Sequence, residues 1–218
     1  MGNRIIAIGD IHGCSTALKT LLDTISVTAT DTVISLGDLV DRGPDSKGVI
    51  EQLLELKDRC NFVLIQGNHE EMLLNVVRDG EAPHEWLKHG GVATLDSYGF
   101  TGDVSVVPHD HIAFMESAVP FFETDEHFFV HGNYAPKIAL ADQDPTVLRW
   151  KSLIESTPGP HISGKKAVVG HTPDKSGEIF DIGHLICIDT FCYGGRWLTG
   201  MDVASGEVWQ ANDEGDVR

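Results

Sequence analysis

Aspartate, asparagine and histidine side chains follow five short apolar runs of this chain. Apolar runs of four or five residues are typical of buried strands, whereas these polar side chains are costly to bury unless something nearby uses them. The polar residues in question, each beside a glycine or one residue away from it, are Asp10, His12, Asp38, Asn68, His131 and His171. One such occurrence is typical of an ordinary turn, but five in one chain are hard to explain by loop composition. We therefore treat the six residues as candidate functional residues.

The chemistry of this set is that of a metal centre. It combines imidazole nitrogen with hard oxygen and contains no thiolate, a mixture that suits Mn²⁺, Fe or Zn²⁺. Six ligands with one shared carboxylate fit two ions about 3.5–4 Å apart, and such a pair can activate water and hold the oxygens of a transferring phosphoryl group. The sequence therefore predicts a centre of two divalent ions that acts on phosphate.

Alternating strands and helices would bring these side chains together. The apolar pattern predicts helices over 15–25, 46–56 and 70–77, and strands over 5–8, 32–36, 62–65, 127–130, 167–169, 184–188, 197–203 and 208–211. The order strand–helix in the first half favours parallel strands with right-handed crossovers, whose carboxyl ends share one edge. We predict an α/β fold with some antiparallel sheet, in a single domain over residues 1–218.

The composition limits the partners of the protein. Its net charge is −17, from 33 acidic and 16 basic residues. Such a surface repels nucleic acid and anionic membranes, so a phosphorylated substrate must be attracted by local positive charge. We expect no membrane helix and no signal peptide, because no apolar stretch is long enough for a membrane helix. Four cysteines without CxxC spacing are typical of a reduced, cytoplasmic protein. We expect no disulfide between Cys187 and Cys192.

The motifs around the candidate residues resemble a known set. GDIHG (9–13), GDLVDRG (37–43), GNHE (67–70), HG (131–132) and GHT (170–172) look like the signature of the phosphoprotein phosphatases, which belong to the calcineurin-like metallophosphoesterases. The resemblance extends in order from residue 5 to about residue 210. The segment WLKHGGVATLDSYG (86–99) looks closer to bacterial and phage members than to eukaryotic ones.

The resemblance implies a mixed β-sandwich of two sheets flanked by helices, with two metal ions above it. It places the ligands as follows: Asp10, His12 and His171 at one ion, Asn68 and His131 at the other, and Asp38 as the bridge. Mn²⁺ is the favoured ion, with Fe or Zn²⁺ as alternatives.

The resemblance also implies how the reaction proceeds. His69 would protonate the leaving group, Asp41 would orient its ring, and Arg42 would hold the phosphate oxygens. Metal-bound hydroxide would attack the phosphorus directly, without a phosphoenzyme intermediate.

Some residues depart from the family pattern. The second phosphate-binding arginine usually sits two residues after a tryptophan, but here Arg149 precedes Trp150 and Lys151 follows it. We favour Arg149 because a guanidinium matches phosphate better than an ammonium group does. Phe191 stands where a glycine is expected after Asp189 and Thr190.

Other notable residues have a simpler interpretation. His109 and His111 are expected in a polar loop without function. Trp86, Tyr98 and Phe100 are expected either to line a substrate groove or to pack in the core.

These features favour a phosphatase for phosphoserine and phosphothreonine in proteins, with phosphotyrosine as a further target. Its partner would be a phosphorylated protein or peptide, and the acidic surface favours basic ones. The alternative is a symmetrical diadenosine-tetraphosphate hydrolase, because GDIHGC and GDLVxRGPDS resemble that branch. A third hypothesis is a non-catalytic metal-binding scaffold, which would be expected to lose His69, Asp41 or Arg42. All three are present.

Overall fold

The strands of the first half form a parallel core to which the end of the chain adds two antiparallel strands. The computed structural model describes residues 3–102 and 104–218. In the first sheet β1 (Ile5–Ile8), β2 (Thr32–Ser35) and β3 (Asn61–Leu64) are parallel, and β9 (Leu198–Asp202) and β10 (Val208–Ala211) complete the order β10-β9-β1-β2-β3.

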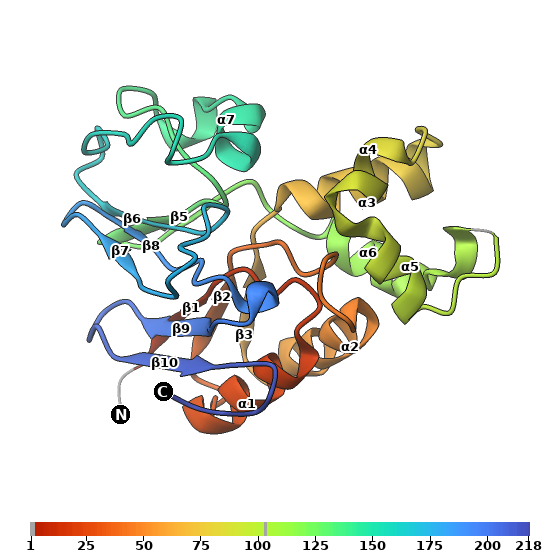
Figure 1. Ribbon diagram of the computed structural model, residues 1–218. Helices are drawn as coiled ribbons and strands as arrows, with labels where there is room; N and C mark the ends of the chain where they lie inside the picture. Colours follow the sequence, from red (N-terminus) through yellow and green to blue (C-terminus); the bar gives the residue numbers. More distant parts are fainter. Residues whose placement is uncertain (1–2, 103) are drawn as a thin grey trace.

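A second sheet lies face to face with the first (Figure 1). It contains β4 (Phe122–Glu123), β5 (His127–Phe129), β6 (Lys166–Val169), β7 (Phe180–Asp181) and β8 (Leu185–Cys187), in the order β4-β5-β6-β8-β7. Strands β5, β6 and β8 are parallel to one another, and the two edge strands are antiparallel to their neighbours.

Alternating side chains on the strands divide the core into layers. On β1, Ala7 faces the second sheet, whereas Ile6 and Ile8 pack with the helices on the other side. On β6, Val168 faces the first sheet and Val169 packs with the layer on the outside of the sandwich. This period-two pattern is what a strand buried on both faces requires.

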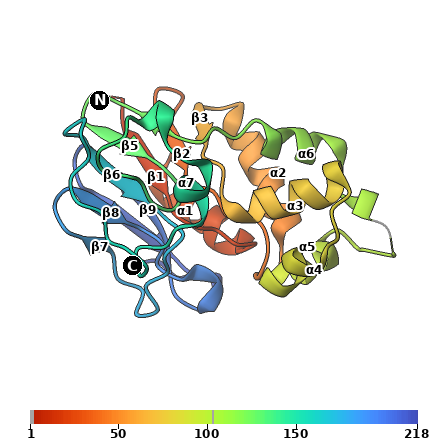
Figure 2. The same cartoon turned by 90° about the horizontal axis from the view of Figure 1, so that it is seen from above.

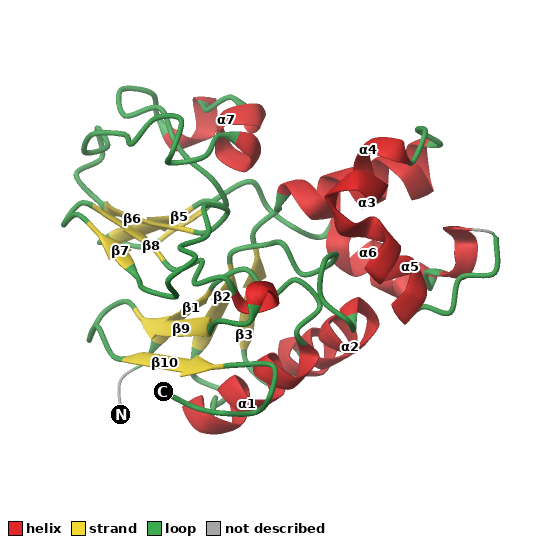
Figure 3. Cartoon of the chain, viewed as in Figure 1, coloured by secondary structure: helices red, strands yellow, loops and turns green. Residues whose placement is uncertain are grey.

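The helices occupy three places around the sandwich. Helices α1 (Ser15–Ile25) and α2 (Ser46–Lys57) lie beneath the first sheet, and α7 (Pro145–Trp150) lies above the second (Figure 1). Helices α3 (Asn68–Asp79), α4 (His84–Trp86), α5 (Val92–Ser97) and α6 (His109–Glu116) gather at one side of the sandwich, as the view from above shows (Figure 2). The separation of helices from strands is clear when the chain is coloured by secondary structure (Figure 3).

The predicted fold class is confirmed, and the predicted strands agree with the structure to within two residues at each end. Three expectations were incomplete or wrong. Helix α3 begins at Asn68 and not at Glu70, because the Glu70 carboxylate accepts the Gly67 N–H and closes the first turn. His109 and His111 lie in α6, which begins directly after Pro108, and not in a loop. Strands β4 and β7 were not predicted, because two residues each are too few to show an alternating pattern.

The expectation of free cysteines is confirmed, since all four cysteines are unpaired. Among the described residues, none of the helices is both long and apolar enough to span a membrane.

Candidate metal centre

The carboxyl ends of β1 and β8 meet closely at the edge where the candidate residues lie. A Cβ atom on Gly9 would sit 2.4 Å from the Ile188 carbonyl oxygen, so only glycine fits at this point. Asp10 follows directly and is 3% exposed. Its two carboxylate oxygens accept the His171 backbone N–H at 2.9 and 3.1 Å, which ties the loop after β1 to the loop after β6.

Two groups of candidate ligands share Asp38. In the first, the Nε2 atoms of His12 and His69 lie 3.4 and 3.9 Å from Asp38 Oδ2. In the second, His131 Nε2 lies 3.3 Å from Asp38 Oδ1, and Asp38, His131 and His171 bring one ligand atom each to within 4.8 Å of the others. A carboxylate with one oxygen toward each group is placed to bridge two ions.

Asn68 completes the second group. Its Oδ1 lies 3.1 Å from His131 Nε2 and 3.0 Å from His171 Nδ1, and the two histidine nitrogens are 3.1 Å apart. The resemblance places His171 with Asp10 and His12 at the other ion. The structure instead puts the His171 ring beside His131, because β6 and β5 are adjacent strands.

Backbone carbonyls fix the orientation of three candidate histidine ligands. His12 Nδ1 lies 2.8 Å from the Val40 oxygen, His131 Nδ1 lies 2.7 Å from that of Leu36, and His171 Nε2 lies 2.9 Å from that of Trp150. Each of these nitrogens must carry a proton to donate to a carbonyl, so the other nitrogen holds the lone pair in His12 and His171, and would hold it in His131 once that ring gives up its second proton. Those lone pairs point into the cluster, the arrangement that metal-binding histidines require. The donor set therefore fits divalent ions.

The electrostatics of the buried cluster agree with this fit. Burial holds the pKa of His12 well below its usual range and lowers the pKa of His171 to about 4, so both rings are neutral at pH 7. Burial opposes the charge on Asp38 as well, but His131 and His69 outweigh it and hold the Asp38 pKa well below its usual range. Despite burial, Asp38 raises the pKa of His131 to about 10, so an ion bound there would displace a proton.

Asp189 is a buried carboxylate outside the motifs that predict the ligands. It is 2% exposed, its Oδ2 has no hydrogen-bond partner among the described residues, and burial raises its pKa to about 7. Burial and the Asp189 charge together raise the pKa of Asp10 well above its usual range. Asp189 follows β8, a strand that ends at the same edge, and this position is the feature of the sequence that could have predicted it. Nearby negative charge of this kind favours bound cations.

His69 and Asp41 form a buried pair beside the cluster. His69 Nδ1 lies 2.6 Å from Asp41 Oδ2, and both side chains are fully buried. Two residues from the helical side hold Asp41 in place: Trp86 Nε1 donates to its carboxylate at 2.9 Å, and the Thr94 hydroxyl donates at 2.6 Å. His69 Nε2 is buried without a partner among the described atoms, so it is free to give a proton to a group at the cluster.

Of the cationic side chains considered for phosphate binding, Arg149 has contacts that differ from expectation. Arg42 lies over the Tyr193 ring and its Nη1 is 2.9 Å from His12 Nε2, at the mouth of the cluster. Arg149 instead donates to Gln66 at 3.0 Å and to Glu71 at 2.5 Å, and is thus committed to other residues. The side chain of Lys151, by contrast, has no hydrogen bond or ion pair within the part of the chain that the structure describes.

Left-handed backbone is concentrated in this region. Non-glycine residues with positive φ include His12 (46°), Asp38 (52°), Asp41 (73°), Arg42 (70°) and His171 (64°). Each such residue costs of order 1–3 kcal/mol and persists only where the surroundings impose it. Five of the candidate residues are therefore held in conformations that local preference disfavours.

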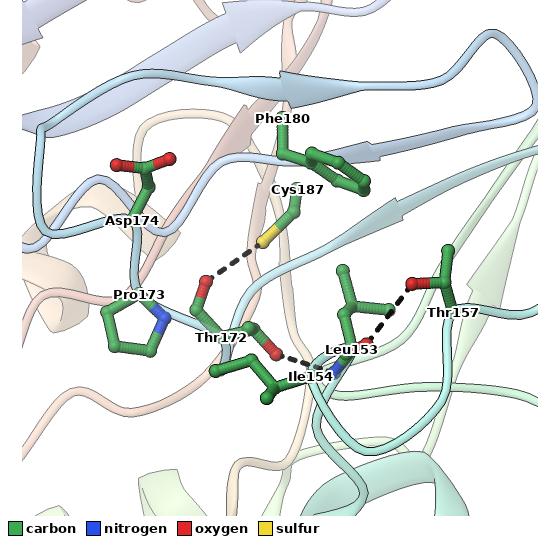
Figure 4. A pocket seen from close by; sticks show the side chains of 8 residues that line it. All are labelled: Leu153, Ile154, Thr157, Thr172, Pro173, Asp174, Phe180 and Cys187. Carbon is green, nitrogen blue, oxygen red and sulfur yellow. Dashed lines mark hydrogen bonds between the residues drawn. The ribbon is translucent and has the colours of Figure 1, made fainter.

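A separate apolar pocket lies on the outer side of the second sheet (Figure 4). Its lining includes Leu153 and Ile154 from the loop after α7, Thr172 and Pro173 after β6, and Phe180 of β7. Its volume is about 260 Å³. The Thr172 hydroxyl already accepts the Leu153 N–H at 2.9 Å. None of the candidate ligands lines this pocket, so it is not the place of the chemistry.

The comparison with known families agrees with the donor set of the cluster. The family model described as calcineurin-like phosphoesterase matches residues 3–203. The chain therefore belongs to the calcineurin-like phosphoesterase family, whose members use a centre of two metal ions.

Curated relatives carry two different names. The chain is 40% identical over 85 residues to serine/threonine-protein phosphatase 1 of Salmonella typhimurium, an alignment that covers 38% of this chain and 37% of the relative. It is 33% identical over 150 residues to the symmetrical bis(5'-nucleosyl)-tetraphosphatase of Nitrosomonas europaea, covering 66% of this chain and 52% of the relative. The enzyme of the same name from Janthinobacterium is 29% identical over 167 residues, covering 70% and 55%. The aligned parts thus span about half or less of these relatives.

Solved structures share the fold. One described as a candidate diadenosine tetraphosphatase superposes with a TM-score of 0.73 at 22% identity, covering 97% of this chain and 94% of the other. The cold-active protein-tyrosine phosphatase of a Shewanella species superposes with a TM-score of 0.69 at 16% identity, covering 100% and 80%.

Proposed function

We propose that this metallophosphoesterase hydrolyses symmetrical dinucleoside tetraphosphates, with phosphorylated proteins as the second candidate substrate. The observation that carries the first candidate is the agreement of relatives: the alignments that cover 66% and 70% of this chain are both with enzymes named for that activity. The match to the protein phosphatase covers 38% of the chain. The proposal reverses the order favoured by the sequence motifs alone.

The proposed ligands are the residues of the cluster, in a single domain: Asp10, His12, Asp38, Asn68, His131 and His171. Two divalent ions held there, with Mn²⁺ as the proposed ion, would polarise phosphate oxygens and activate water. The chain supplies the geometry, since the carbonyl-fixed histidines and the Asp38 carboxylate are placed before any substrate arrives.

Cationic side chains would orient the phosphate. Arg42 lies at the mouth of the cluster and can direct its planar fork at two phosphate oxygens. Because Arg149 is committed to Glu71 and Gln66, we propose Lys151 as the second phosphate ligand in place of Arg149. A polyphosphate substrate needs this local positive charge, since the chain as a whole carries −17.

One feature of the site favours the second candidate. Cleavage of a phosphoserine or phosphothreonine ester expels a strongly basic alkoxide, which needs a proton donor, whereas cleavage of a phosphoanhydride expels a weakly basic phosphate. The His69–Asp41 pair, held by Trp86 and Thr94, is built like such a donor. Hydrolysis of phosphoproteins therefore remains a proposal that geometry supports.

A direct comparison tests both candidates. Diadenosine tetraphosphate and a phosphoserine peptide would be offered to the same preparation with Mn²⁺ and then with a chelator. We expect Mn²⁺-dependent release of ADP from the dinucleotide at a higher kcat/KM than phosphate from the peptide. Turnover of the peptide alone would make the chain a protein phosphatase. Turnover of neither would favour the non-catalytic scaffold.

A further inference from the structure

The first turn of α3 uses consecutive residues for different parts of the site. Asn68 faces the second ligand group and His69 forms the pair with Asp41. Glu70 accepts the backbone N–H groups of Asp38 at 2.9 Å and Leu39 at 2.7 Å, and so shapes the loop that presents Asp38. Burial raises the pKa of Glu70 to about 7. The next residue of the turn has no place in the proposed reaction.

That residue, Glu71, joins α3 to α7. One of its carboxylate oxygens accepts Arg149 Nη2 at 2.5 Å, and the other accepts the Trp150 indole N–H at 2.5 Å. The Glu71 side chain is 23% exposed and that of Arg149 is 14% exposed, so the contacts are shielded from bulk water. Hydrogen bonds to a charged acceptor in such surroundings are stronger than neutral ones.

Trp150 connects Glu71 to a candidate metal ligand. The Trp150 carbonyl oxygen lies 2.9 Å from His171 Nε2 and is the only group outside the ligand cluster that fixes the His171 ring among the described residues. Helix α7 has six residues and ends at Trp150, so no further helical turn holds this carbonyl. The indole contact with Glu71 is the hydrogen bond that anchors the Trp150 side chain, which also packs against the core and against the His89 ring.

We propose that Glu71 is a positioning residue that, through the Trp150 indole, holds His171 in the orientation that binds metal. The inference rests on the metal centre and not on which substrate is hydrolysed. Partners of metal-binding histidines commonly change metal affinity by roughly 10–100-fold when they are lost. Glu71 does not contact His171 itself and would act by keeping the Trp150 carbonyl in place.

The test measures Mn²⁺ binding by titration calorimetry and electron paramagnetic resonance, without any substrate. Glu71→Ala removes both acceptors, and Trp150→Phe removes the indole donor while leaving Glu71 paired with Arg149. We expect both variants to weaken one of the two Mn²⁺ sites by about tenfold or more. The double variant should be no weaker than either single one, because the two residues act in one path.

Two further variants distinguish the contact between Glu71 and the Trp150 indole from the ion pair between Glu71 and Arg149, which also holds α7. Glu71→Gln keeps an oxygen for the indole but loses the ion pair, and Arg149→Met removes the ion pair together with the Gln66 contact while leaving the indole contact in place. We expect Mn²⁺ affinity near that of the parent in both. Asp31→Asn, which breaks a buried carboxylate–arginine contact far along the chain, serves as the control for lost stability.

Unchanged affinity at both Mn²⁺ sites in Glu71→Ala and Trp150→Phe would overturn the proposal. So would a loss in Arg149→Met as large as that in Glu71→Ala, because the ion pair would then be the route. Failure of the proposed function would appear as absent turnover with Mn²⁺ binding intact, a result that is distinct from both.

Discussion

At the scale of single residues, the His69–Asp41 pair separates the two candidate substrates. Asp41 accepts hydrogen bonds from Trp86, Thr94 and the His69 ring, so the ring has one available orientation. Its free Nε2 faces Asp38 and not the solvent. A proton donor in this position matters in proportion to the basicity of the leaving group.

The first prediction concerns His69→Asn. We expect a loss of roughly 10²–10⁴-fold in kcat for a phosphoserine peptide, the usual contribution of a general acid. Loss for p-nitrophenyl phosphate or diadenosine tetraphosphate should be much smaller, because their leaving groups are weak bases. The measurement is kcat for all three substrates at saturating Mn²⁺. Equal losses for all three would mean that His69 does not act as the acid.

A second prediction concerns Asp31, which is buried and paired with Arg4 at 2.6 Å. The hydrogen bond from Arg4 holds the Asp31 pKa well below its usual range, so its stabilising effect is present above about pH 4, the unfolded-state pKa. That effect is lost as the pH falls toward the folded-state pKa. We expect Asp31→Asn to lower the free energy of unfolding at pH 7 by about 1.5–3 kcal/mol.

Urea unfolding of both proteins from pH 7 to pH 3 checks this prediction. The difference between parent and variant should shrink steadily below about pH 4, because Asp31 of the unfolded parent then takes up a proton while the folded parent keeps its carboxylate ionised. A difference that stays constant down to pH 3 would show that the carboxylate charge is not what stabilises the contact.

At the scale of elements, the turn from β3 into α3 is the most constrained part of the site. A Cβ atom on Gly67 would lie 2.3 Å from Asp38 Oδ1 and 2.5 Å from the Asp38 nitrogen. Gly80, at the other end of the same helix, has a φ of 69°, and a Cβ atom added there would meet nothing within 4 Å among the described residues. Gly67 is therefore required because no side chain fits beside Asp38, and Gly80 is required because its backbone is left-handed.

The third prediction compares alanine at these two ends. Gly80→Ala should lower the free energy of unfolding by about 1–2 kcal/mol, the cost of left-handed backbone for an L-residue, and leave Mn²⁺ binding unchanged. Gly67→Ala should displace Asp38 and weaken Mn²⁺ binding at both sites. Titration with Mn²⁺ and urea unfolding distinguish the two. Normal Mn²⁺ affinity in Gly67→Ala would contradict the close contact with Asp38.

The elements also show what a sequence can and cannot predict. Strands β1 to β3 and their polar ends were predictable because apolar runs and adjacent glycines are local signals. The support of Asp41 by Trp86 and Thr94 was not, since it joins positions about 45–53 residues apart that follow no periodic pattern. The pairing of Arg149 was hidden for the same reason: its partner Glu71 is 78 residues away. The grouping of His171 with His131 depended on sheet order, which the motifs do not contain.

At the scale of the whole molecule, net charge distinguishes substrates by their response to salt. The chain carries −17, and screening of exposed charges extends to about 10 Å at 0.1 M ionic strength. A tetraphosphate is repelled by this field, and a basic phosphopeptide is attracted by it.

The fourth prediction follows from that field. As NaCl increases from low to physiological concentration, kcat/KM for diadenosine tetraphosphate should rise, and kcat/KM for a lysine-rich phosphopeptide should fall. An acidic phosphopeptide of the same length is the control and should behave like the dinucleotide. Parallel responses of the basic and acidic peptides would mean that charge near the site, and not the global charge, governs encounter.

The ligand cluster draws its side chains from both layers of the sandwich: Asp38 and Asn68 follow strands of the first sheet, and His131 and His171 follow strands of the second. Ions bound between these side chains would cross-link the two layers. The melting temperature of the protein would then depend on the concentration of free metal ion. Binding to the folded state alone contributes about 2.7 kcal/mol when the free ion is at a hundred times its Kd. Calorimetric melting should therefore move upward with Mn²⁺ and downward with a chelator, even in a variant that has lost all turnover.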